Sequence, residues 1–174
     1  MASSPARFGW HRDGFIGAGP QPGGWRDGWG SAFVELRLRP QLETLQGLSQ
    51  DSTGLDQLLL RLAEQLNDLQ PRPALVHGDL WGGNAASLVD GRGSIFDPAS
   101  WWADREVDLA MTRLFGGFSE AFSRGYREVL ADSPGFEDRV EIYNLYHLLN
   151  HANLFGGGYV SQCRASLKEL ARRL

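Results

Sequence analysis

A strand–loop–hairpin pattern in residues 74–98 constrains the fold more than any other feature of this sequence. A short apolar run leads into the tripeptide HGD at 77–79, and a polar loop follows that ends at Asn84. Two further apolar runs flank Asp90-Gly91, a dipeptide that favours a tight hairpin turn. The segment therefore predicts one strand, a loop and a β-hairpin.

Three polar side chains, Asp79, Asn84 and Asp97, fall at the ends of these expected strands or on the loop beside them. Because the two strands of a hairpin pair side by side, Asn84, before the first strand, should lie near Asp97, after the second. A carboxylate that takes a proton, beside an amide and a second carboxylate that hold a hard cation, suits phosphoryl transfer. We expect Asp79 to act as the general base, and Asn84 and Asp97 to bind Mg²⁺.

Helical periodicity is clearest in residues 55–69, where leucines recur every three or four positions. Pro40 is expected to end one helix or to open the next. Residues 1–30, rich in Gly, Pro and Trp, predict irregular structure. The remaining helices are expected at residues 29–47, 104–115, 119–130, 137–155 and 160–174. The fold class is mainly α with a small β-hairpin element (α+β), in a single domain spanning residues 1–174.

Composition argues against several classes of protein. The net charge of −4 gives no reason to expect a nucleic acid or a membrane surface as partner. No apolar run approaches the roughly 20 residues that span a bilayer, and the first residues do not form a secretion signal. The single cysteine, Cys163, excludes an internal disulfide. We therefore expect a cytoplasmic protein.

Several sequence blocks, taken in order, resemble the fructosamine/ketosamine-3-kinase family. The resemblance runs from Phe8 to about Leu170, and the order of the blocks makes it specific. It implies a protein-kinase-like C-terminal lobe that phosphorylates a sugar hydroxyl of a glycated amine, with ATP as co-substrate and Mg²⁺ as cofactor. The blocks are FGWH at 8–11, PQ at 20–21, RL at 37–38, HGDLWGGN at 77–84, FDPASWW at 96–102, DREVDLAMTRLFGGF at 104–118 and LYHLLNHANLFGGGY at 145–159.

The resemblance also assigns supporting roles. His77 and Asp108 are expected to hold the shape of the loop that carries Asp79. Trp81 and His11 are expected to contact the substrate; Trp81 either stacks on the sugar ring or packs under the loop. Residues around the N-terminal segment and Trp101-Trp102 are expected to be exposed, or to be covered by a second copy of the chain.

The elements that usually hold the nucleotide phosphates are not found in this sequence. It contains no GxGxxG, and its one lysine, Lys168, lies in the last expected helix. The resemblance implies that the N-terminal lobe is absent from this chain. One alternative is therefore a catalytically inactive or truncated lobe that acts as a binding module.

A second alternative is a metal-dependent hydrolase. His147 and His151 lie one helical turn apart, and with His77 and Asp79 they have the spacing of a zinc site. Because the sequence around both histidines is apolar, we favour core histidines whose hydrogen bonds are satisfied.

Overall fold

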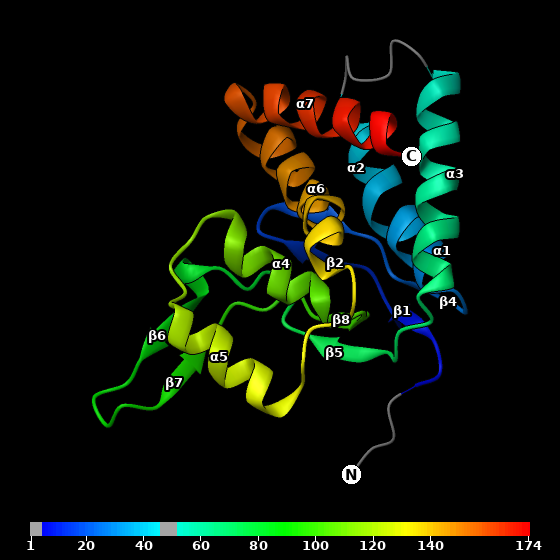
Figure 1. Ribbon diagram of the computed structural model, residues 1–174. Helices are drawn as coiled ribbons and strands as arrows, with labels where there is room; N and C mark the ends of the chain where they lie inside the picture. Colours follow the sequence, from blue (N-terminus) through cyan, green and yellow to red (C-terminus); the bar gives the residue numbers. More distant parts are fainter. Residues whose placement is uncertain (1–4, 46–51) are drawn as a thin grey trace.

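The computed structural model describes residues 5–45 and 52–174 (Figure 1). The chain is mainly helical with small antiparallel sheets, which confirms the coarse fold class. One sheet has four strands in the order β4-β1-β8-β5, and two hairpins pair β2 with β3 and β6 with β7. The strands are β1 (Phe8–Trp10), β2 (Gly14–Ile16), β3 (Gly19–Gln21), β4 (Gly24–Arg26), β5 (Ala74–Val76), β6 (Ala85–Ser87), β7 (Gly93–Ile95) and β8 (Trp101–Ala103).

The prediction of irregular structure for residues 1–30 is wrong for residues 8–26, which contain β1 to β4. Each of these strands has three residues, too few to show the alternation by which a strand is recognised. Gly9 illustrates why a glycine-rich composition does not indicate irregular structure here. Its φ is +125°, and a Cβ there would lie 1.9 Å from the carbonyl oxygen of Gly24. The glycines permit close pairing of β1 with β4.

The helices follow the predicted ranges closely. The first helical segment runs from Trp29 to Thr44 through a π-helical stretch, and Pro40 stands in the first turn of its last part, Arg39–Thr44, as expected of a proline that opens a helix. The end expected at Gly47 lies outside the described residues. The helices are α1 (Trp29–Phe33), η1 (Val34–Leu38, π-helical), α2 (Arg39–Thr44), α3 (Ser52–Asp68), η2 (Gly82–Asn84, 3-10), α4 (Glu106–Leu114), α5 (Glu120–Val129), α6 (Phe136–Phe155) and α7 (Gly158–Arg173).

An aromatic cluster joins the four-stranded sheet to the helices. Trp29 of α1 is 1% exposed, and its ring centroid lies 5.4 to 6.0 Å from those of Phe8, Phe33, Trp101 and Tyr143. Its indole Nε1 donates a hydrogen bond to the Tyr143 hydroxyl at 3.1 Å. The expectation that Trp101 is exposed is therefore wrong: it is 2% exposed and packs inside the core.

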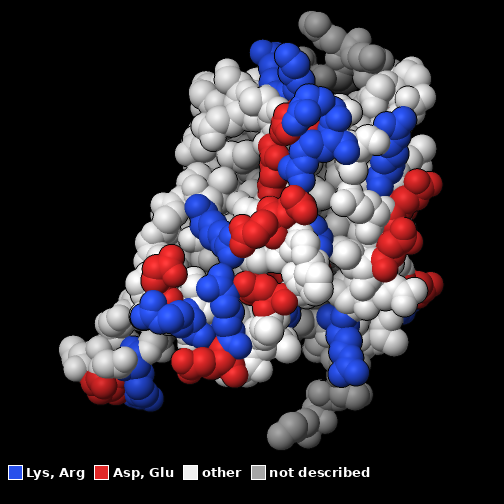
Figure 2. Space-filling model, in the orientation of Figure 1, with Lys and Arg blue, Asp and Glu red and all other residues white. Residues whose placement is uncertain are grey.

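Ion pairs connect the helices of the C-terminal half. Glu106 of α4 and Arg139 of α6 are buried, and they form a bidentate pair at 2.7 and 2.9 Å. In Figure 2, basic and acidic side chains are interleaved over the face that carries α5 to α7, where Arg173 pairs with Glu141 at 3.1 Å. Among the described residues, no helix has both the length and the apolar character required to traverse a membrane.

The β6–β7 hairpin extends away from the helices at one end of the molecule (Figure 1). Ala85 pairs with Ile95 and Ser87 with Gly93, so the turn falls at Asp90-Gly91 as predicted. The end of the hairpin opposite its turn adjoins the loop that follows β5. Asn84 precedes the hairpin at this end, and Asp97 follows it.

Candidate active site

The carboxylate of Asp79 is half-buried in the loop that follows β5. Its Oδ2 accepts a hydrogen bond from Nδ2 of Asn84 at 3.0 Å, and the same Nδ2 donates to the Asp79 carbonyl at 2.9 Å. Partial removal from water raises the pKa of Asp79, while the hydrogen bond from Asn84 works in the opposite direction. The structure therefore brings together two of the predicted site residues in a loop of six residues.

Asp108 of α4 anchors the backbone of this loop. Its Oδ2 accepts from the amide of His77 at 2.7 Å, and its Oδ1 accepts from the amide of Gly78 at 2.9 Å. Gly78 has a φ of +82°, and a Cβ there would lie 2.2 Å from the carbonyl oxygen of Ala99. Burial raises the pKa of Asp108, and the two backbone hydrogen bonds oppose that shift.

His77 connects the loop to the end of the hairpin. Its Nδ1 accepts the amide of Asp79 at 3.3 Å, so the ring proton lies on Nε2, which donates to the Phe96 carbonyl at 2.9 Å. The ring is thus held by backbone groups on either side, which fits the expectation that His77 maintains the shape of the loop.

Asn84 faces Phe96 across the base of the hairpin, and Asp97 is the next residue along the chain. The amide of Phe96 donates to the carbonyl of Asn84 at 3.1 Å. Asn84 is buried and Asp97 is exposed, with the unusual φ of +53°. The Asn84 amide nitrogen is used by Asp79, so its amide oxygen remains as a donor atom for a cation. Oxygen donors of this kind fit Mg²⁺, which completes its shell with phosphate and water.

His147 of α6 lies beside Asp79, two residues that the sequence analysis grouped only in the zinc-hydrolase alternative. It is 3% exposed, and its Nδ1 lies 3.9 Å from Oδ1 of Asp79 without a hydrogen-bond partner in the described part of the chain. Burial lowers the pKa of His147 to about 3, so the two groups do not form an ion pair at neutral pH. Helical periodicity placed this residue on an apolar face and gave no signal of its contact with the loop.

The prediction of satisfied core histidines is right for His151 and wrong for His147. Nδ1 of His151 bonds to the carbonyl of His147 at 2.9 Å, and its ring packs 4.8 Å from Phe115 and 5.1 Å from Tyr159. Within residues 5–45 and 52–174, no group of three or more His, Cys, Asp or Glu side chains is arranged to hold a metal ion. The four-residue zinc site of the hydrolase alternative is not formed.

The two residues expected to contact substrate have different positions. Trp81 is 39% exposed, and its ring meets that of Phe115 edge-on at 6.1 Å. A Cβ on Gly83 would lie 2.3 Å from the Trp81 ring, so the indole covers the loop backbone there. His11 is exposed in the bend after β1, where its ring lies 5.1 Å from that of Trp10. In the described regions, His11 makes no contact with the Asp79 loop.

Comparisons with known proteins identify relatives of this chain. A probable ketoamine kinase of Synechocystis sp. is 48% identical over 172 residues, which are 99% of this chain and 58% of that protein. The ketosamine-3-kinase of Mus musculus is 38% identical over 156 residues, 88% of this chain and 50% of that protein. This chain thus spans between half and three-fifths of the length of these curated relatives.

A solved structure has the same fold. The crystal structure of a candidate fructosamine-3-kinase from Haemophilus somnus 129PT superposes with a TM-score of 0.84 at 29% identity, covering 98% of this chain and 58% of that one. The sequence model described as fructosamine kinase matches residues 1–173. The chain therefore belongs to the fructosamine kinase family.

Proposed function

We propose that this chain is the protein-kinase-like C-terminal lobe of an ATP-dependent phosphotransferase that acts on a sugar hydroxyl of a glycated amine. The observation that carries the proposal is the contact of Asp79 with Asn84 beside the hairpin end that holds Asp97. A proton acceptor and two oxygen donors for a hard cation then occupy one end of the fold, as phosphoryl transfer requires.

Asp79 is the group that orients the substrate hydroxyl and takes its proton. Its carboxylate is half-buried, and the lowered exposure to water raises its pKa and makes it a stronger base than a surface aspartate. The Asn84 amide fixes one carboxylate oxygen at 3.0 Å, which leaves Oδ1 to receive the proton. The neutral imidazole of His147, 3.9 Å from Oδ1, adds no positive charge that would weaken this base.

Asn84 and Asp97 are the residues that would hold Mg²⁺, through the amide oxygen of the first and the carboxylate of the second. When bound there, the ion neutralises negative charge on the nucleotide phosphates. The left-handed backbone of Asp97 is a strained conformation for a residue with a side chain, and strain of this kind collects at functional positions. Its place after Phe96, whose backbone is held by both Asn84 and His77, supports the assignment.

His77 and Asp108 are positioning residues in this proposal. Neither touches the reacting atoms; each holds backbone groups that flank Asp79. Trp81 and His11 remain proposed substrate contacts. Trp81 follows the base by two residues and keeps an exposed ring face, which suits stacking on a sugar.

One observation favours the alternative of a lobe that binds without turnover. Kinases of this class hold the nucleotide phosphates with a lysine on a strand. Lys168, the one lysine of this sequence, is exposed on α7 and does not reach the loop through any described contact. The two readings differ in whether this chain alone binds ATP and transfers phosphate.

The test is a transfer assay with this chain, ATP, Mg²⁺ and fructosyl-lysine, with ATP binding measured in parallel. Asp79→Asn should abolish transfer, whereas Asp56→Asn, an exposed aspartate on α3, should leave it unchanged. Transfer that survives Asp79→Asn would contradict the assignment of the base. Absence of both ATP binding and transfer in the unsubstituted chain would favour the binding module.

A further inference from the structure

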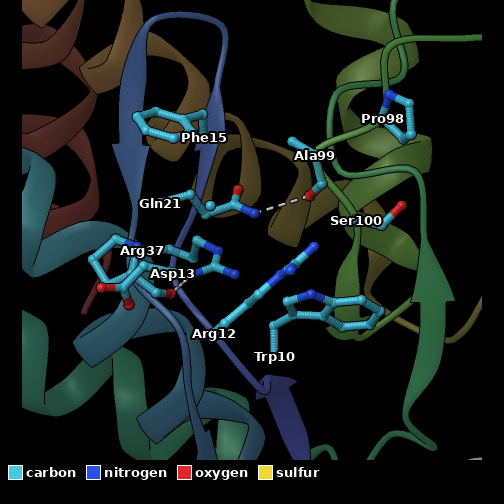
Figure 3. A pocket seen from close by; sticks show the side chains of 11 residues that line it. Trp10, Arg12, Asp13, Phe15, Gln21, Arg37, Pro98, Ala99 and Ser100 are labelled. Atoms are coloured by element: carbon cyan, nitrogen blue, oxygen red, sulfur yellow. Dashed lines mark hydrogen bonds between the residues drawn. The ribbon is translucent and has the colours of Figure 1, made fainter.

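A cavity of about 480 Å³ lies between the N-terminal strands and the segment that follows Asp97. Its lining includes Trp10, Arg12, Arg37 and Ser100 (Figure 3). Two guanidinium groups therefore reach into one hollow, from two different parts of the chain. None of the proposed catalytic steps uses this cavity.

Arg37 is buried at the inner side of the cavity, and two of its three guanidinium nitrogens are unused. It is 1% exposed, and its guanidinium stacks 3.8 Å above the Trp101 ring. Nη1 donates to the carbonyls of Pro22 and Leu36 at 2.9 and 2.8 Å. Nε and Nη2 are also buried, but they have no hydrogen-bond partner in the described structure. Buried donors without a partner are costly, so their retention calls for an explanation.

The unused groups form the edge of the guanidinium that binds oxyanions. Arg139 shows this in the same molecule: its Nε and Nη2 hold the two oxygens of Glu106 at 2.7 and 2.9 Å. In Arg37 the same two nitrogens are free, while Nη1 and the stacked Trp101 ring fix the orientation of the group. A pre-oriented guanidinium edge is suited to bidentate binding of a carboxylate or a phosphate.

The charge of Arg37 is not balanced by a described acidic partner. Burial lowers its pKa to about 10, which still leaves the group protonated at neutral pH. A buried charge without a counter-ion is unfavourable, and an anion in the cavity would remove that penalty.

Arg12 supplies a second positive charge from the exposed side of the cavity. It forms no hydrogen bond or ion pair with any residue in the described ranges. The neighbouring Asp13 also lines the cavity, but its Oδ1 accepts the amide of Gly23 at 2.8 Å. Gln21 is committed at both ends, donating to the Ala99 carbonyl and accepting from the Tyr146 hydroxyl, each at 3.0 Å. The cavity thus offers two free cationic groups.

We propose that this cavity is an anion-binding subsite, in which Nε and Nη2 of Arg37 hold two oxygens of a small-molecule carboxylate or phosphate and Arg12 closes over it. The wall formed by residues 98–100 continues directly from Asp97. The anion that fits this position is the free carboxylate of a glycated amino acid that serves as substrate. This choice of anion rests on the proposed function. A phosphate group shares the chemistry and is the second source to be tested.

The test is direct binding without nucleotide, by calorimetry and by tryptophan fluorescence, because Trp10 lines the cavity and Trp101 stacks against Arg37. The probes are inorganic phosphate, fructosyl-glycine and its carboxamide, in a buffer free of other oxyanions. Arg37→Lys keeps a charge but loses the two-nitrogen edge, and Arg12→Ala changes an exposed side chain. Arg61→Ala, an exposed arginine of α3 that does not line the cavity, is the matched control. Circular dichroism checks that each variant folds.

Saturable binding of fructosyl-glycine, weakened at least about tenfold by Arg37→Lys and by loss of the carboxylate in the carboxamide, supports the substrate source. Stronger binding of inorganic phosphate with the same dependence on Arg37 and Arg12 supports the phosphate source. Absence of saturable binding, or binding that both Arg37→Lys and Arg12→Ala leave unchanged, overturns the proposal. These binding assays need neither ATP nor phosphate transfer, so failure of anion binding is distinguishable from failure of the proposed phosphotransferase.

Discussion

Replacing Asp108 with alanine tests how strongly α4 holds the loop that carries Asp79. The substitution removes a carboxylate that accepts two backbone amides, at 2.7 and 2.9 Å. Hydrogen bonds to a charged group contribute about 1.5–3 kcal/mol each, so the gross loss is about 3–6 kcal/mol. Part of this free energy is regained, because the largely buried carboxylate no longer has to be removed from water. We expect a net loss of about 2–4 kcal/mol in the free energy of unfolding.

Asp56→Ala is the matched control for this measurement. Asp56 also forms a hydrogen bond of 2.9 Å, to Arg39, but both side chains are about half exposed, at 55% and 42%. An exposed pair of this kind contributes at most about 1 kcal/mol. Urea unfolding followed by circular dichroism gives both values. If both variants lost the same free energy of unfolding, the reasoning would be refuted, because the burial of the Asp108 carboxylate and its two hydrogen bonds would then have no measurable effect.

Three further substitutions test the same region. Gly78→Ala should destabilise the chain by at least about 2 kcal/mol more than Gly91→Ala in thermal or urea unfolding. The two glycines have nearly the same φ, +82° and +83°, but only a Cβ at position 78 would meet a backbone oxygen. Asn84→Ala removes a hydrogen bond that favours the charged form of Asp79, so NMR titration of that carboxyl should show a still higher pKa; a fall would contradict the assigned cause. Activity that depends on ionised Asp79 should rise with pH through this raised pKa, with its midpoint above the ordinary value of about 3.9. Arg139→Ala should cost about 3–5 kcal/mol of stability, because it leaves a buried carboxylate without its partner; a loss under about 1 kcal/mol would contradict this.

Local patterns in the sequence predicted the features that local interactions determine. The Asp90-Gly91 turn placed the hairpin, and the leucine repeat placed α3, because turn geometry and helical periodicity depend on neighbouring residues. The strands β1 to β4 escaped prediction because each has only three residues, and β1 in addition pairs with a distant segment. Gly9, for example, pairs with Trp25 on one side and with Trp102 on the other.

The candidate site divides in the same way. Asp79 and Asn84 lie five positions apart, and Asp97 follows the hairpin that begins after Asn84, so the contact of Asp79 with Asn84 and the place of Asp97 at the hairpin end could be inferred from order alone. His147 and Arg37 could not be placed, since each reaches its site only through the packing of distant helices on the sheet. A charged or imidazole side chain within an apolar helix gives no sign of which of its nitrogen atoms will be left without a partner.

The imidazole of His77 uses both of its nitrogens on backbone groups, one on each side of the site. The Asp79 turn and the hairpin end at Phe96 are thereby joined through one rigid ring, and their fluctuations become correlated. Solvent exchange of the Asp79 amide hydrogen requires its hydrogen bond to Nδ1 of His77 to open, and a movement of the ring that opens this bond also strains the contact with Phe96. The segment with the proposed base and the segment with Asp97 should therefore open to water in one cooperative event and not independently.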